Sequence, residues 1–226
     1  MNINQIETKL TSSDFQDRLQ AVTALKDYSA DIAIPLLIKL KKDQQFLVRS
    51  FVAMGLGRKK SPESLATLLE MLKFDPDTNV RAEACNSLSF FGEISIPHLQ
   101  QAFHQDDSWL VRLSILAVFM DFKCADELFD ICLCGIAGDD YTVRETSLKG
   151  LGELAGTFKE DSALEELLKM IDDSSWRIRA KTALALGQFT NPKARDALSK
   201  LKQDQDLRVV KAVLDATINI NHESAK

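Results

Sequence analysis

The residues best suited to nucleophilic, redox or metal chemistry in this chain are its four cysteines and three histidines. Cys132 and Cys134 are two residues apart on an expected helix, so their side chains point about 200° apart and cannot bind one ion together. His98 and His104 are six residues apart, which is about 240° around a helix. The sequence has no GxSxG, HExxH or Walker motif. We therefore predict no catalytic residue and no metal site.

The other cysteine positions add little to this. Cys85 falls at a small, apolar position and is expected in the core, as is Cys132. Cys124 is expected near a turn between two helices, where it could act as an exposed redox thiol. Four cysteines without regular spacing do not form a disulfide framework, so we expect a protein of the reducing cytoplasm.

The most regular chemical feature is a cationic side chain that recurs every 31 to 35 residues. This column consists of Arg18, Arg49, Arg81, Arg112, Arg144, Arg179 and Lys211. Acidic residues lie six positions before four of these arginines, at Asp43, Asp75, Asp106 and Asp173. A guanidinium presents a planar fork of donors that matches a carboxylate. We expect a structural ladder of ion pairs between repeats, and the alternative is that the column binds an anion.

A second column lies three residues before the cation and is mostly aromatic. Its aromatic members are Phe15, Phe46, Trp109, Tyr141 and Trp176, and it is interrupted at Thr78 and Arg208. Large rings at such positions either pack between repeats or anchor a partner, because they bury much area at a small entropic penalty. We hypothesise that Trp109, Tyr141 and Trp176 form a partly exposed stripe that binds a partner, together with Phe46 as a further candidate.

Charge is distributed unevenly along the chain. Residues 121–175 carry 5 basic and 14 acidic side chains, and residues 176–226 carry 10 basic and 5 acidic ones. The partner-binding candidates in these segments are Asp126, Glu127 and Asp130 on the acidic side, and Lys193, Arg195 and Lys200 on the basic side. An acidic surface beside a basic one can steer a charged partner, although solvated helix faces explain most charge clusters.

The residues that follow each cation indicate helices. Apolar or small residues recur at +3, +4 and +7, as at Val52, Ala53 and Leu56, which is the pattern of a buried helix face. A second apolar stripe follows in each repeat, as at Leu65 and Leu68. Each repeat therefore reads as a pair of helices, and the chain as an all-α solenoid.

Residues that begin and end helices agree with this reading. Gly57, Gly152 and Gly187 are expected as left-handed C-caps, Pro35, Pro62, Pro97 and Pro192 at the starts of second helices, and Asp77 and Asp140 as N-caps. Three extra residues near 156–161 predict a longer loop within one pair. We expect one repeat array over residues 1–226 that ends in a polar tail at 221–226.

Composition excludes several classes of function. The longest run without a formal charge is 94–105, which is shorter than the ~20 apolar residues of a membrane-spanning helix. A net charge of −5 and a pI near 5.3 argue against a nucleic-acid binder, since such proteins neutralise phosphates with basic side chains. We expect a protein partner, no nucleic acid and no membrane span.

The repeat motif resembles a known family. Segments such as VRSFVAMGLG from Val48 and IRAKTALALG from Ile178 look like HEAT repeats of the phycobilisome (PBS) lyase HEAT-like subtype. The resemblance implies a right-handed α-solenoid of about seven HEAT-like helix pairs. Free-standing arrays of this subtype are similar to cyanobacterial E/F-type phycobilin lyase subunits and NblB-type phycobilisome degradation proteins.

Two functions follow from these observations. The first is a non-enzymatic scaffold that binds a protein partner through the solenoid surface and needs no cofactor. The alternative, implied by the resemblance, is a phycobilisome-directed role as a bilin lyase subunit or degradation factor. Its partner would be a phycobiliprotein, and a bilin or other tetrapyrrole would be bound, with Cys124 as a conceivable bilin carrier.

Overall fold

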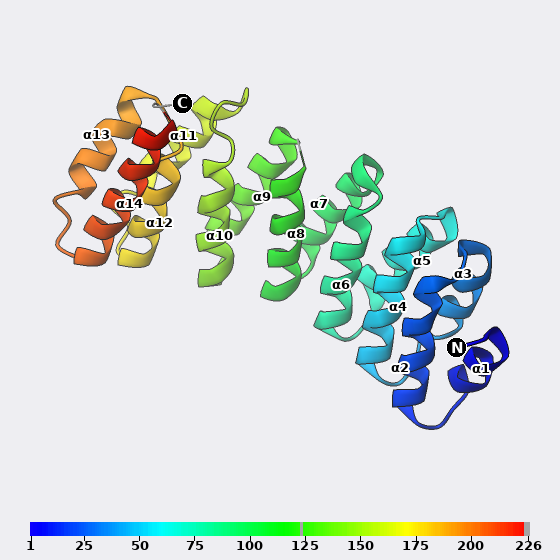
Figure 1. The fold of residues 1–226 in the computed structure, drawn as a ribbon. Coiled ribbons are helices and arrows are strands. Elements are labelled where there is room, and N and C mark those ends of the chain that lie inside the picture. The colour runs from blue at the N-terminus through cyan, green and yellow to red at the C-terminus, as the bar shows by residue number, and fades with distance from the viewer. Residues whose placement is uncertain (123, 224–226) are drawn as a thin grey trace. The chain divides into compact units, whose positions relative to one another are not determined.

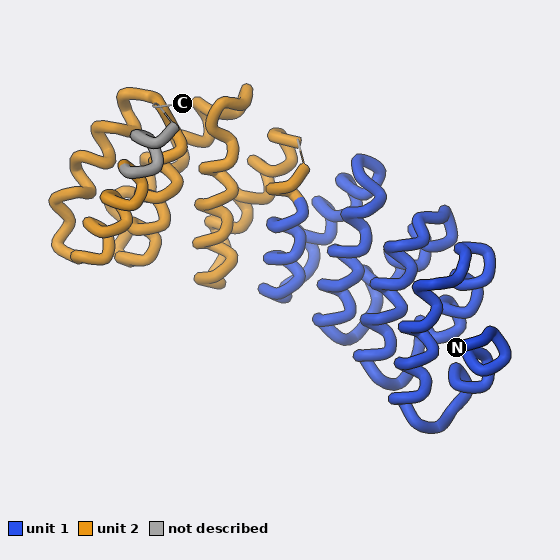
Figure 2. The backbone as a smooth tube through the Cα atoms, in the orientation of Figure 1, with its two compact units in different colours: residues 1–118 blue, residues 119–226 orange. Residues whose placement is uncertain are grey.

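The computed structural model describes residues 1–122 and 124–223, and the regular structure in that part of the chain is entirely helical (Figure 1). The all-α prediction is therefore confirmed. The chain divides into two compact units, Met1–Val118 and Phe119–Lys226 (Figure 2). None of the described helices combines the length and the apolar character that crossing a bilayer requires.

The first unit consists of consecutive helix pairs. Its elements are α1 (Ile3–Leu10), α2 (Phe15–Ala24), the 3-10 helix η1 (Leu25–Asp27), α3 (Ala30–Lys39), α4 (Phe46–Lys59), α5 (Pro62–Phe74), α6 (Thr78–Ser89), the 3-10 helix η2 (Gly92–Ser95), α7 (Ile96–Gln105) and most of α8 (Trp109–Asp121). Helices α2, α4 and α6 pack side by side, and α3, α5 and α7 form a second layer against them. The core lies between the layers, at residues such as Val52, Leu56, Leu68 and Leu88, all fully buried.

The second unit repeats this arrangement. It contains the end of α8, α9 (Ala125–Ala137), α10 (Tyr141–Gly152), α11 (Glu160–Lys169), α12 (Trp176–Leu186), α13 (Pro192–Leu201) and α14 (Leu207–Glu223). Helices α10, α12 and α14 form one layer, and α9, α11 and α13 pack on it. Helix α14 extends to Glu223, into the segment expected as a polar tail, and residues 224–226 of that segment lie outside the described residues.

Most helix starts follow the sequence signals. The Asp77 carboxylate accepts a hydrogen bond from the Asn79 amide at 2.8 Å, and Asp140 accepts one from Val143 at 2.9 Å, so both are N-caps as predicted. Pro62, Pro97 and Pro192 occupy the first turns of α5, α7 and α13. The prediction for Pro35 is wrong, because this proline lies inside α3, which begins five residues earlier at Ala30.

The prediction that Gly57, Gly152 and Gly187 are left-handed C-caps is wrong. Gly57 lies inside α4, and Gly187 ends α12 with a right-handed conformation, so neither is a left-handed cap. A Cβ atom at Gly57 would lie 2.7 Å from the Cβ of Ser87, and one at Gly187 would lie 2.7 Å from the Cβ of Ala216. These glycines therefore allow the first helices of neighbouring repeats to approach closely.

The same reason applies to Gly152, which ends α10, where a Cβ atom would lie 3.2 Å from the Cα of Ala185. A left-handed conformation is found instead at Gly92 and Gly156, with φ of 66° and 73°, and at Lys60, with φ of 48°. Gly156 lies between α10 and α11, in the longer loop that the sequence predicts.

We expect Gly57→Ala to lower the free energy of unfolding by about 1–3 kcal/mol, because the new methyl group would overpack the contact between α4 and α6. Gly55→Ala is the matched control on the same helix, since its Cβ would meet side-chain atoms of Leu37 and no backbone atom of a neighbouring helix. Its effect should be smaller, because alanine favours a helix over glycine by about 1 kcal/mol. Urea denaturation followed by circular dichroism measures both, and equal losses would contradict the close-approach explanation.

Candidate partner-binding site

The arginine column forms bidentate ion pairs between consecutive repeats. Arg49 donates from Nε and Nη2 to the two carboxylate oxygens of Asp75, at 2.7 and 2.9 Å, and from Nη1 to the backbone oxygen of Asp43 at 2.7 Å. Each guanidinium therefore binds a carbonyl in its own turn and a carboxylate in the next. The same arrangement joins Arg18 to Asp43, Arg81 to Asp106, and Arg179 to Asp204.

The remaining members of the column differ from this pattern. Arg144 makes a longer contact with Asp173, at 3.3 Å, and donates from Nε to the carbonyl of Ile136. Arg112 donates to the carbonyl of Asp106 at 2.8 Å and lies over a buried phenylalanine ring, and Lys211 is exposed. The four bidentate arginines use most of their donors on protein acceptors, which leaves them few donors for an anion.

The ladder changes the acidity of Asp204, the carboxyl group that pairs with Arg179. Hydrogen bonding to Arg179 lowers the pKa of Asp204, against an opposing contribution from burial. Nearby, the hydrogen bonds from Arg208 lower the pKa of the half-buried Asp206 to about 2.

The structure places the aromatic column in two different environments. Phe46, Trp109 and Tyr141 are exposed at the first positions of α4, α8 and α10. Phe15 and Trp176 are half-buried. One face of the Trp176 indole is covered by Arg208, whose guanidinium lies 3.4 Å from the ring centroid. Arg208, which interrupts the aromatic column, therefore stacks on Trp176, the aromatic residue of the preceding repeat.

The charged candidates are partly engaged within the second unit. Asp126 pairs with Lys159 at 2.6 Å, and Lys200 pairs with Asp172 at 2.6 Å. Glu127 and Asp130 are half-buried on α9, whereas Lys193 and Arg195 are exposed on α13. The Lys200–Asp172 pair joins the basic and acidic segments, and both of its side chains are exposed.

The cysteines have the environments that the repeat positions predict. Cys85 and Cys132 are completely buried, and burial raises the pKa of both thiols. Cys124 is half-buried at the N-cap of α9, where burial and then the charge of Glu127 raise its pKa to about 11. It is therefore a poor nucleophile at neutral pH. No group of His, Cys, Asp or Glu within the described residues is arranged to hold a metal ion.

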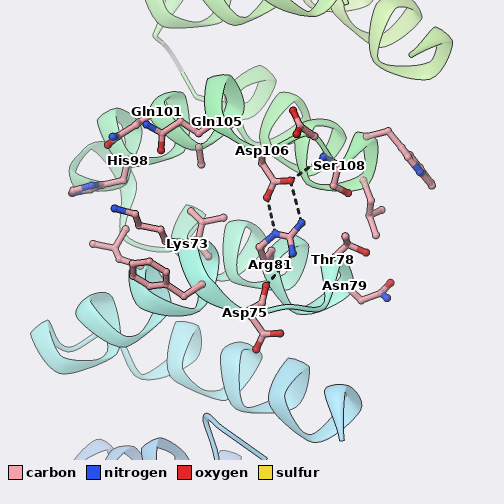
Figure 3. Close-up of a pocket in the computed structure, with 17 residues that line it drawn as sticks. Lys73, Asp75, Thr78, Asn79, Arg81, His98, Gln101, Gln105, Asp106 and Ser108 are labelled. Carbon is pink, nitrogen blue, oxygen red and sulfur yellow. Dashed lines mark hydrogen bonds and ion pairs between the residues drawn. The ribbon is translucent and has the colours of Figure 1, made fainter. Parts of the chain in front are cut away.

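The first unit contains a pocket of about 1070 Å³ that sequence reasoning did not find. It lies between α5 and α7 and is bounded by the turns before α6 and α8 (Figure 3). The Arg81–Asp106 ion pair forms one wall. The other polar lining groups include Lys73, His98, Gln101 and Gln105.

Two exposed aromatic side chains belong to this pocket. Phe74, the last residue of α5, is 68% exposed, and Trp109, the first residue of α8, is 52% exposed. We call this combination of pocket and aromatic residues the α5–α7 groove. Only Trp109 was a candidate from sequence, because the repeat column signals it. Phe74 follows an apolar stripe, and nothing in the sequence separates it from the core.

The chain resembles known proteins both in its sequence repeats and in its fold. A family model described as HEAT repeats matches residues 3–73, 34–118 and 133–217. The search of curated proteins found no match. The structure is similar to that of YibA from Escherichia coli, with 15% identity, coverage of 96% of this chain and 92% of that one, and a TM-score of 0.60.

Two further solved structures are similar. The first is a structure of Kap95p with RanGDP, with 15% identity and a TM-score of 0.71; the match covers 95% of this chain and 35% of that one. The second is the CpcE–CpcF complex of phycocyanin lyase from Nostoc sp. PCC7120, with 18% identity, a TM-score of 0.53, and coverage of 98% and 93%. At these identities the likeness concerns the fold.

We expect Arg49→Met to lower the free energy of unfolding by about 3–5 kcal/mol, because it leaves the buried Asp75 carboxylate without its partner. Lys200→Met is the matched control, since its ion pair with Asp172 is exposed on both sides and such pairs contribute about 0–1 kcal/mol. Urea denaturation measures both, and similar losses would show that the ladder adds no special stability.

Acid should destabilise the protein in part through Asp204, the ladder carboxylate that pairs with Arg179. Because the folded state lowers the pKa of Asp204, its stabilising contribution is present above the unfolded value near ~3.9 and is lost as the pH falls through the lower folded value. Asp204→Asn should therefore show a weaker loss of stability between about pH 5 and pH 2 than the wild type. Asp196→Asn, an exposed control on α13, should retain the wild-type pH dependence; an unchanged profile in Asp204→Asn would refute this role.

Proposed function

This chain belongs to the HEAT-repeat family, and we propose that it acts as a scaffold that binds a protein partner through the α5–α7 groove. The observation that carries the proposal is the pair of exposed rings, Phe74 and Trp109, beside a pocket of about 1070 Å³. Exposed aromatic side chains next to a concave surface are typical anchors of protein interfaces, since their burial against a partner is strongly favourable.

The chemistry of the described residues supports binding rather than catalysis. The regular polar groups are engaged in the ladder, the most buried thiols have raised pKa values, and no metal-binding cluster occurs in the described part of the chain. A general acid or base requires a titratable group whose environment adapts it to proton transfer. Besides the Arg81–Asp106 ion pair, the groove offers amides, Lys73, His98, Asp107 and aromatic rings, which are groups that can recognise a partner.

The other sequence candidates remain proposals as contact residues. Phe46 and Tyr141 are exposed and could extend a partner surface within their own units. Lys193 and Arg195 are exposed and could contact acidic groups. We rank these four residues below the groove residues because they do not line the groove.

The partner can be captured by placing a photo-crosslinking residue, p-benzoylphenylalanine, at Trp109 or Phe74. Irradiation in lysate of the source cells should yield a discrete crosslinked protein, identified by mass spectrometry. The same residue at Phe90 is the control, since that side chain is 49% exposed in the same unit but does not line the groove. Absence of a specific product at both groove positions, or equal products at all three, would contradict the proposal.

A second candidate is a phycobilisome-directed role, in which the partner is a phycobiliprotein and a bilin is bound, either for lyase activity or for degradation. It is favoured by the resemblance of the repeat motif and by the similarity to the CpcE–CpcF complex of phycocyanin lyase. The captured partner distinguishes the two candidates, because a phycobiliprotein subunit with a tetrapyrrole absorbance band would support the second one. A colourless partner of another kind would exclude it.

A further inference from the structure

We propose that the α5–α7 groove recognises an extended peptide segment of the partner that carries an acidic side chain and, two residues away, a bulky apolar one. The inference rests on the proposed scaffold function and names the kind of segment that the scaffold binds. Three features of the groove carry it: a pair of amide side chains, a cation without an acidic partner, and two exposed rings.

The first feature is the pair Gln101 and Gln105 on α7, which line the groove and are exposed. Within the described part of the chain, neither side chain takes part in a hydrogen bond. They are four residues apart, so their Cα atoms are separated by ~6 Å along the helix axis. Alternate residues of an extended strand are separated by ~6.6–6.8 Å.

This match of spacings has a chemical consequence. A primary amide can donate to a carbonyl and accept from an N–H at the same time. Gln101 and Gln105 can therefore each pair with the backbone of alternate residues in a strand that runs along α7. Backbone pairing of this kind gives affinity that is independent of the partner's side chains, and the flanking groups then provide selectivity.

The second feature is the charge of the groove. Asp75 and Asp106 belong to the lining, but Arg49 and Arg81 hold them in bidentate ion pairs. Lys73 has a contact with the Phe74 ring, 5.2 Å from its centroid, and forms no ion pair within the described residues.

In Figure 3 the Lys73 side chain and the His98 ring lie on the same side of the pocket, away from Asp106. Asp107, the other carboxylate of the lining, is adjacent to Asp106 in sequence at the turn before α8. A partner carboxylate is therefore best placed beside Lys73, where it gains a charge-assisted hydrogen bond, and His98 can add a ring N–H donor.

The third feature is the apolar surface. Phe74 and Trp109 are exposed, and the half-buried Leu69 adds apolar surface to the lining. A bulky apolar side chain next to either ring removes apolar area from water on both sides of the contact. Side chains two residues apart in a strand point to the same face, so one extended segment can present the acid and the apolar group together.

The test uses fluorescein-labelled hexapeptide pools and the full-length protein. One pool has Glu and Phe fixed two residues apart with the other positions randomised, and the matched pool has Lys in place of Glu. Fluorescence anisotropy should show binding of the Glu pool to be about tenfold tighter than that of the Lys pool, which corresponds to ~1.4 kcal/mol. Lys73→Glu should reverse this preference, and Gln101→Leu with Gln105→Leu should weaken the binding of both pools.

Lys39→Glu is the matched control, since Lys39 is an exposed lysine at the end of α3, outside the groove. It should keep the wild-type preference, and circular dichroism checks that each variant is folded. Any of three results would overturn the proposal. They are a lack of peptide binding, a preference that Lys73→Glu does not change, and displacement of the labelled peptides by free glutamate as effective as that by the unlabelled Glu pool. A partner crosslinked at Trp109 would in those cases still support the scaffold function, so the two failures are distinguishable.

Discussion

The bidentate ion pair between an arginine of one repeat and an aspartate of the next is the interaction on which the rest of this structure depends. It joins a guanidinium to a carboxylate in the following turn and to a carbonyl in its own turn, as Arg49 does with Asp75 and Asp43. Asp75 is also bonded by the backbone amide of Asp77 at 2.9 Å, so the pair fixes the start of the next helix. Since both partners are nearly buried, neither can be removed without leaving a charge in a poorly solvated site.

The ladder also determines which groups remain for function. Because its arginines and aspartates are engaged with one another, the side chains free to meet a partner are those that the repeat does not use. In the first unit several of these line the pocket between α5 and α7, among them Lys73, Gln101 and Gln105, which share its lining with the Arg81–Asp106 pair (Figure 3). The ladder pair forms one wall of the pocket, and the other residues of the lining are those that the proposed partner would contact.

Sequence alone predicts the parts of the fold that recur. The period of the cationic column predicts the helix pairs. The aspartates that lie six residues before a cation are the acidic partners of the cation one repeat earlier, as in the pairs of Arg18, Arg49 and Arg81. The N-caps at Asp77 and Asp140 follow from residue type and place. These features depend on local spacing, which the sequence displays directly.

The remaining features depend on contacts between segments that are distant in sequence. From sequence, Gly57 suggests the end of a helix. In the structure it lies inside α4, where the close approach of Ser87 leaves no room for a side chain. Trp176 matches the other aromatic residues of its column, but Arg208 covers one of its faces. The spacing of Gln101 and Gln105 is visible in the sequence, yet only the packing of α5 against α7 makes them line a pocket with Phe74.

The most direct measurement of the central claim is hydrogen–deuterium exchange of the protein, alone and bound to the partner captured by crosslinking. If the groove is the binding surface, backbone amides within residues 69–79 and 98–110 should exchange more slowly in the complex, because these segments line the groove. Residues 46–60, which form the neighbouring helix α4 and its C-cap outside the lining, should exchange at the same rate in both states. Protection confined to the second unit, or unchanged exchange around the groove, would contradict the account.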